Sequence, residues 1–339
     1  MALGFVEGTA LVTLSDRVLA DGVRLLALEL ALAEVEFPLD LQGGAEEFQR
    51  RSTRLGYLAL EVETRAVAAA LDAALAAQDR ALRDVRLTAD GGRWVLEGTL
   101  GPKGPPVAAD VWVGPAAGEG LEVHVHDVRV FGPSALCGVG VPRDVEVGLR
   151  EVLARLGRRD ADAVLTQGAS VFSFDPVGAL LWALLPVHGW KVPIHEGVAI
   201  RKVAFTPQGN LQILVGESTA GHVPPPAEAI SEASVMAARA RADAERLLPA
   251  VEGQVSAGAL PAAFSVLRDA LEEGSERALE LLLSVGAADR SLFGATVDLA
   301  ADQLTLAPDH VAARLAMAVV AEAEARPDDA REHYEQAGR

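Results

Sequence analysis

Two histidines, His124 and His126, have the residue type and spacing that best suit metal chemistry. Residues i and i+2 of a strand project to one face, so the two imidazoles could share an ion with the adjacent Asp127. The alternating apolar residues of the same segment would form the opposite, buried face. We therefore expect both histidines on a solvated face and predict no metal site.

A nucleophilic serine is indicated only in part. The sequence Gly168-Ala-Ser170 begins a nucleophile elbow, but Phe172 stands where that motif requires its second glycine. Walker loops, paired-cysteine motifs, zincin helices and dinucleotide fingerprints are absent from the sequence, and the single Cys137 excludes an intrachain disulfide or thiolate cluster. We predict a non-catalytic protein without catalytic residues or cofactors; an enzyme acting on a lipid-like substrate is a weaker alternative.

The charge balance limits the partners. With 30 basic and 48 acidic residues the formal net charge is -18. Nucleic-acid binding depends on cationic side chains that displace counterions from phosphates, so we exclude nucleic acid as a partner. Anionic leaflets repel such a chain on average, so a peripheral membrane contact would have to be apolar or use a local basic patch.

Strands dominate residues 1–222. The segment 87–100 predicts a hairpin, because Asp90-Gly91-Gly92 supplies turn residues between two alternating runs. Residues 203–215 predict a second hairpin that turns at Gln208-Gly209-Asn210, and residues 121–131 predict a strand with one buried face.

Two helices are predicted among these strands, over residues 65–82 and 176–185. In the second helix, Pro176 suits the first helical position after the capping carboxylate of Asp175. Each helix precedes a hairpin and follows a strand, so strand, helix, strand, turn and strand occur twice in one order. The two copies can be aligned with Val67 against Val177 and Leu71 against Leu181, and we interpret them as an internal duplication.

The composition changes after residue 222. Three successive prolines in residues 223–229 predict a stiff, extended linker. Residues 230–339 show helical spacing without a strand pattern, and residues 223–339 hold 10 arginines and 20 acidic residues. Two domains, 1–222 and 230–339, are therefore expected.

The C-terminal part resembles the tetratricopeptide repeats. The 4-then-3 spacing of that family's second helix occurs in two places, and Pro308 stands where the family places its inter-repeat proline. The two sets are Ala263, Leu267, Ala270 and Ala330, Tyr334, Ala337. A middle unit with Thr296, Ala300 and Gln303 fits poorly, and a generic helical bundle is the alternative. The resemblance implies a protein partner on a concave face.

Residues 1–222 resemble the tubular lipid-binding (TULIP) superfamily, especially small bacterial proteins of the LmeA type. The resemblance lies in the repeated order of elements and in the lysine-x-proline loop, strand and hairpin of residues 189–216. It implies an α+β fold of curved antiparallel sheets wrapped on two helices, with an apolar groove for lipid. Proteins of that type are exported, whereas no export signal is visible here.

We predict that the protein binds lipid or another apolar ligand in this groove, and one version of this prediction adds transfer of the ligand. The helical repeats would bind a protein partner. Residues 177–186 are apolar on every side, which requires burial or a non-aqueous partner. The residues expected to contact the ligand are Val67, Leu71, Leu75, Val177, Leu180, Leu181 and Leu184. The alternative is a non-catalytic scaffold that acts through its helical tail and has a filled, ligand-free body.

Three further expectations concern the surface and location. Trp190 and Lys191 should form a membrane contact, since an indole and an ammonium suit the interface between water and lipid; the alternative packs Trp190 under its loop. Apolar Leu315, Met317, Val319 and Val320 in the last helix pair suggest a homo-oligomer. Without a signal peptide or an apolar span the chain should be cytoplasmic, or exported if a targeting segment was removed.

Overall fold

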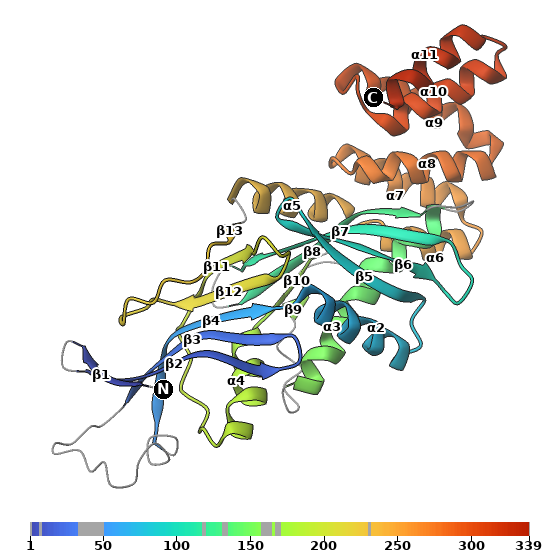
Figure 1. The fold of residues 1–339 in the computed structure, drawn as a ribbon. Helices are drawn as coiled ribbons and strands as arrows, with labels where there is room; N and C mark the ends of the chain where they lie inside the picture. The colour runs from blue at the N-terminus through green and yellow to red at the C-terminus, as the bar shows by residue number, and fades with distance from the viewer. Residues whose placement is uncertain are drawn as a thin grey trace.

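The computed structural model shows two antiparallel sheets followed by an array of helices (Figure 1). It describes residues 2–6, 9–32, 51–116, 120–130, 135–156, 165–166, 171–229 and 232–338. The predicted α+β class, with antiparallel sheets and a helical C-terminal part, is confirmed. Residues 168–170 of the incomplete serine motif and the side chain of Leu184 lie outside what is described.

The first sheet, here sheet A, joins segments that are far apart in the sequence. Its long strands are rich in leucine and valine, and the leucines that face the helices are buried. The strands lie in the order β1 (Ala2–Val6), β2 (Thr9–Ala20), β3 (Val23–Leu32), β4 (Thr53–Val62), β12 (Leu211–Gly216), β11 (Ile200–Phe205) and β13 (Glu228–Ala229).

The second sheet, sheet B, holds the strand that was predicted over residues 121–131. Its order is β5 (Leu82–Asp90), β6 (Arg93–Leu100), β7 (Pro106–Pro115), β8 (Leu121–Val130), β10 (Val171–Phe174) and β9 (Leu165–Thr166). Both predicted hairpins are present, as β5–β6 and β11–β12. Gly91 and Gly92 have φ angles of 54° and 83° between Asp90 and Arg93, the conformation for which a two-residue hairpin turn selects glycine.

A β-bulge interrupts the alternation in β8. Ala108 pairs with Arg129 and Asp110 pairs with His126, so β8 carries one more residue than β7 between these pairs. Asp127 takes a positive φ of 51° there. The extra residue shifts the alternation of side chains between the two faces by one position. Val125 before the bulge and Val128 after it therefore both lie in the core.

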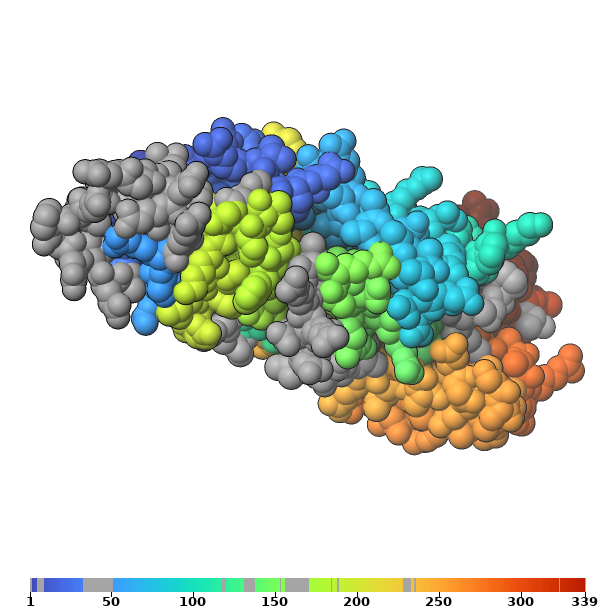
Figure 2. Space-filling view, turned by 90° about the horizontal axis from the view of Figure 1, so that it is seen from below, coloured from blue at the N-terminus to red at the C-terminus, as the bar shows by residue number. Residues whose placement is uncertain are grey.

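Among the described residues, three helices cover the inner faces of the sheets, whereas two were predicted. Helix α2 (Thr64–Ala77) ends earlier than expected, because Leu82 already belongs to β5, and α4 (Pro176–Leu184) begins with Asp175 accepting from the Val177 amide at 2.8 Å. Helix α3 (Val141–Leu156) was not predicted. It contacts both α2 and α4, and Figure 2 shows the three helices side by side on one face.

The predicted order of elements occurs twice, and each copy crosses between the sheets. From β4 of sheet A the chain passes through α2 into the β5–β6 hairpin of sheet B. From β10 of sheet B it passes through α4 into the β11–β12 hairpin of sheet A. One apolar core therefore includes residues from both sheets and all three helices.

The proline-rich segment, which was predicted to be a stiff, extended linker, forms hydrogen bonds with sheet A together with the residues just before it. The amides of Thr219 and Ala220 donate to Glu29, and the Gln212 side chain donates to the carbonyl of Pro225. The segment ends in β13, which pairs with β11. Hydrogen bonds thus hold this segment against sheet A.

Beyond residue 231 the described chain is helical. Helix α5 (Glu232–Glu245) lies on sheet B, on the opposite side from α2 and α3 (Figure 1). Each following helix contacts the next, and α8 also contacts α10. These helices are α6 (Pro249–Ser256), α7 (Leu260–Glu272), α8 (Glu276–Ala288), α9 (Arg290–Leu306), α10 (Val311–Ala323) and α11 (Pro327–Ala337).

The residues that carry the repeat resemblance differ in burial. Ala263, Leu267 and Ala270 of α7 are fully buried, whereas Tyr334 of α11 is exposed. Thr296 and Ala300 of the poorly fitting middle unit are also buried, and a Cβ atom on Gly286 of α8 would collide with Thr296. The small Gly286 thus lets α8 and α9 approach closely. The assignment of these helices to the tetratricopeptide repeats stays a prediction.

Within the described residues, no helix combines the length and the apolar character required to cross a bilayer.

Candidate functional site

The junction between sheet B and the C-terminal helices buries the histidines that were expected to be solvated. His124 and His126 are almost completely buried, because α5 covers the polar face of β8. The prediction of a solvated face was therefore wrong. An alternating strand reveals its apolar face, but it does not reveal that a helix more than a hundred residues later covers the other face.

Ion pairs make this polar face compatible with burial. Arg239 of α5 donates to Glu122 at 2.6 Å, and His124 lies 3.1 Å from the same carboxylate. Burial lowers the pKa of His124, although Glu122 opposes this effect. The guanidinium of Arg239 thus neutralises the buried Glu122 carboxylate. The imidazole of His124, which lies next to this carboxylate, favours the uncharged state.

Asp127 at the bulge connects β8 to α5 a second time. Arg241 donates to its carboxylate at 3.1 Å, and His126 lies 2.9 Å away. Burial opposes its ionisation, but the hydrogen bond with His126 and the nearby arginines keep the pKa of Asp127 below its ordinary value. Asp127 is therefore an anion that binds the two parts of the chain together.

Glu245 is also buried in the junction. Its carboxylate accepts from the Asp127 amide at 3.3 Å, and burial, together with the charge of Asp127, raises its pKa to about 8. Burial lowers the pKa of the neighbouring Arg277 to about 10, against the attraction of Glu245. At neutral pH Arg277 is charged, whereas Glu245 is largely protonated.

Asp110, His126 and Asp127 lie close enough together to be considered as metal ligands. However, the Asp110 carboxylate already pairs with Arg129 at 2.8 Å and with Arg93 at 3.1 Å. With Arg241 on Asp127, three guanidiniums surround the cluster, and they would repel a cation. This chemistry suits an ion-pair network better than a metal centre.

A cleft of about 430 Å³ opens beside this network. One wall is β8, the second is the start of α8, and the third is the turn between α9 and α10. The lining residues are Asp127, Arg129, Glu276, Arg277, Glu280, Ala307, Asp309, His310, Val311 and Ala312. Its volume lies within the roughly 300–1,000 Å³ of typical binding pockets.

An apolar stripe on α10 begins at the cleft. Val311, Leu315 and Val319 follow one another at helical i, i+4 spacing, and they are 53%, 42% and 49% exposed. Four residues were expected to form an apolar surface, but two of them are less exposed than this stripe. Met317 packs against the helical core, and Val320 is half-buried. The surface is therefore narrower than expected and includes Val311.

The residues predicted to line a lipid groove lie in the apolar core. Leu71 and Leu75 of α2 and Val177 and Leu181 of α4 are buried, while Val67 and Leu180 are half-buried against the same core. Helix α3 occupies the space between the two predicted groove helices. A Cβ atom on its Gly148 would collide with Leu71.

A small cavity remains between α4 and sheet A. It measures about 10 Å³, close to the space of one water-sized probe. Its lining consists of Leu19, Leu25, Leu28, Leu58, Leu60, Leu180, Leu181 and Leu185. Among the described residues this space is too small for an acyl chain while α4 stays in place.

The predicted membrane contact needs a correction at one of its two residues. Trp190 is only 6% exposed and packs in the core, as in the alternative that placed it under its loop, whereas Lys191 is exposed. The exposed indole in this region is that of Trp182 on α4, at 57%, with Val187 close behind it in the sequence.

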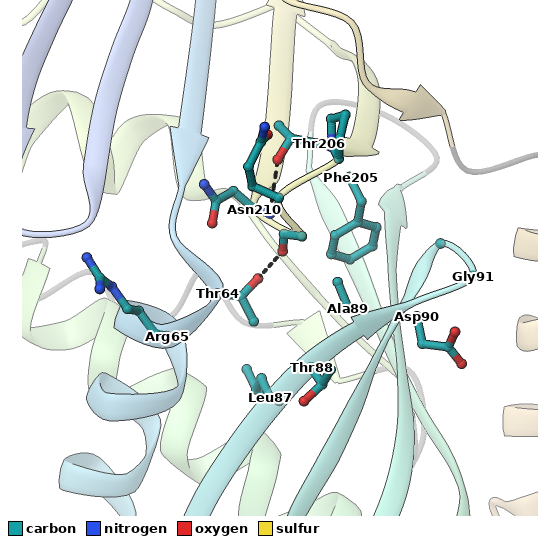
Figure 3. Close-up of a pocket in the computed structure, with 14 residues that line it drawn as sticks. Thr64, Arg65, Leu87, Thr88, Ala89, Asp90, Gly91, Phe205, Thr206 and Asn210 are labelled. Atoms are coloured by element: carbon teal, nitrogen blue, oxygen red, sulfur yellow. Dashed lines mark hydrogen bonds between the residues drawn. The ribbon is translucent and has the colours of Figure 1, made fainter.

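A second, more open pocket of about 650 Å³ lies where the two predicted hairpin turns meet the start of α2 (Figure 3). Thr64 donates to the carbonyl of Gly209 and accepts from the Trp94 indole at 2.9 Å. Arg65 and Asp90 line the pocket, and each pairs with a neighbouring side chain. The hydrogen bond from Thr64 to Gly209 connects the two copies of the repeated unit.

Comparison of the chain with models of protein families, with curated proteins and with solved structures finds no match.

Proposed function

We propose that this protein is a non-catalytic scaffold that holds a protein partner in the cleft between β8, α8 and α10. The single observation that carries the proposal is the continuity of this cleft with the exposed stripe of Val311, Leu315 and Val319. Regularly spaced apolar residues on one helix face, next to a cleft with polar walls, are typical of surfaces that bind a peptide segment.

The buried junction supports this role, since it holds the walls of the cleft together. Asp127 contributes to the wall of the cleft, and its carboxylate is bound by Arg241 of α5. The body thereby supplies one wall and the helical array supplies the others. A body with a filled core serves here as a rigid support.

The test is site-specific photo-crosslinking in cells that produce the protein. A photoreactive amino acid at Leu315 should crosslink a protein whose mass appears as a discrete shift. The same residue at Asp302, an exposed position of α9 outside the cleft, is the control. Equal crosslinking at both positions, or none at Leu315, would reject the cleft as a binding site.

Lipid binding is a second candidate, because α4 combines an exposed indole with a leucine-lined cavity beneath it. An acyl chain would enter if α4 moved away from sheet A. Delipidated protein should then take up a fluorescent fatty acid, and Leu180→Glu, which alters a half-buried lining residue, should abolish the uptake. Absence of uptake by the unaltered protein would remove this candidate.

A further inference from the structure

The charges of the cleft are unequal. Four carboxylates, those of Asp127, Glu276, Glu280 and Asp309, face two guanidiniums. Both guanidiniums already have anionic partners: Arg129 pairs with Asp110 at 2.8 Å, and Arg277 pairs with Glu280. The cleft therefore has little positive charge to offer an anionic ligand.

Two of these carboxylates are unpaired. Glu276 in the first turn of α8 and Asp309 before α10 are exposed, and neither forms an ion pair with another described residue. The helix starts beside them already have caps, since Ser275 accepts from the Ala278 amide and His310 accepts from the Ala313 amide. The cleft thus presents free anions and few free donors, so it favours a cation.

The apolar part of the surface begins between these carboxylates and continues away from them. Val311 lines the cleft together with Asp309, and Leu315 and Val319 extend the apolar face along α10. A matching segment needs cationic side chains at one end and apolar side chains along one face.

We infer that the partner binds through a cationic amphipathic segment, whose lysine or arginine side chains pair with Glu276 and Asp309 while its apolar side chains lie on Val311, Leu315 and Val319. This inference rests on the proposed function and names the chemistry of the partner. Charge complementarity of this kind sets specificity and the rate of encounter.

Other occupants suit the surface less well. A second copy of this chain would bring its own formal charge of -18 to an acidic cleft. Nucleic acids and anionic lipid surfaces would add further negative charge. A basic protein segment is the occupant that the charges favour.

The test uses a fluorescein-labelled peptide of about twelve residues in which arginine and leucine recur at helical spacing. Two matched peptides replace arginine by glutamate or leucine by serine. Fluorescence anisotropy with the full chain should show binding of the first peptide alone. Its affinity should fall about tenfold or more between about 0.05 M and 0.5 M NaCl, because salt screens exposed charges.

Matched variants distinguish binding in the cleft from attraction to the overall negative charge of the chain. Glu276→Lys with Asp309→Lys should weaken binding about tenfold or more, whereas Asp298→Lys with Asp302→Lys makes the same charge change on the exposed part of α9 and should change it less than twofold. Leu315→Ser with Val319→Ser should weaken binding without changing the charge. Circular dichroism verifies that each variant is folded.

Two outcomes would overturn the inference: no binding of the cationic peptide, or equal weakening by both lysine pairs, which would indicate attraction to the overall charge alone. The crosslinking experiment reports on the proposed function separately. If Leu315 crosslinks a protein but the cationic peptide does not bind, the scaffold role stands and the chemistry assigned to its partner is wrong.

Discussion

Helices α4 and α5 each cover a sheet, but with opposite chemistry. Helix α4 covers sheet A with leucines, so its packing depends on apolar area removed from water. Helix α5 covers sheet B with Ala238 and Ala242, which allow a close approach, and with arginines that neutralise carboxylates. An apolar cover tolerates changes of pH, whereas a cover held by buried charges depends on protonation.

The largest effect is expected under α4. Leu181→Ala should lower the free energy of unfolding by about 2–5 kcal/mol, because it enlarges an existing cavity in the core. Urea denaturation measures the loss. A change below about 1 kcal/mol would mean that the sheet does not depend on the leucine cover.

The second prediction uses pH to distinguish the charged cover formed by α5 from the apolar cover formed by α4. Glu245 has a folded-state pKa of about 8, above its ordinary value, so its contribution is fully present below the unfolded-state pKa of about 4.5 and declines as pH rises toward 8. Between about pH 5 and pH 7 the free energy of unfolding should fall by up to about 2.7 kcal/mol because of this group, which corresponds to about 1.36 kcal/mol per pH unit. Glu245→Gln should remove that decline.

Denaturation of both proteins across this pH range measures the difference. The buried His124 acts in the opposite direction: its pKa is lowered, so its contribution is lost as pH falls below the ordinary histidine range. Comparing the Gln variant with the unaltered protein cancels this contribution. Parallel pH profiles for the two proteins would contradict the assignment of Glu245 as a buried, largely protonated acid.

A smaller effect is expected where α5 is partly exposed to solvent. Arg239→Met should destabilise the protein by about 1–2 kcal/mol, since it removes a charge partner of the buried Glu122, while the partial exposure of Arg239 screens the pair. The pKa of His124 should rise, because a repelling cation is lost and an attracting carboxylate remains. Histidine NMR titration measures this. An unchanged titration would place Arg239 away from Glu122 in solution.

The smallest effect provides the matched control for Leu181. Trp182→Ser alters the next residue of α4, whose side chain is largely exposed, so the free energy of unfolding should change by about 0.5 kcal/mol or less. The same urea titration compares the two variants. A loss as large as that of Leu181→Ala would show that both sides of α4 are covered.

The parts of the fold that could be predicted from the sequence are those specified by neighbouring residues. The β5–β6 turn follows from Gly91 and Gly92, and the start of α4 follows from Asp175 and Pro176. Helix α3 was missed although its apolar residues Val141, Val145 and Leu149 have i, i+4 spacing, because the many charged residues between them obscured the pattern.

The candidate site could be predicted much less well. Burial of His126 depends on α5, and the cleft depends on α8 and α10 meeting β8, so neither follows from a local pattern. Leu315 and Val319 were identified as an apolar surface, but the acidic wall beside them was not. Separate segments supply Asp127, Glu276 and Asp309, and only the tertiary fold brings them together.

The crossing of each repeated unit between the sheets has a consequence for synthesis on the ribosome. Strand β4 needs β12 as its neighbour, and β12 is translated about 150 residues later. Until then that edge of β4 stays open, and an unpaired edge is prone to pair with another chain. Because long-range pairings of this kind slow folding, the nascent chain should depend on a chaperone until residue 216 has emerged.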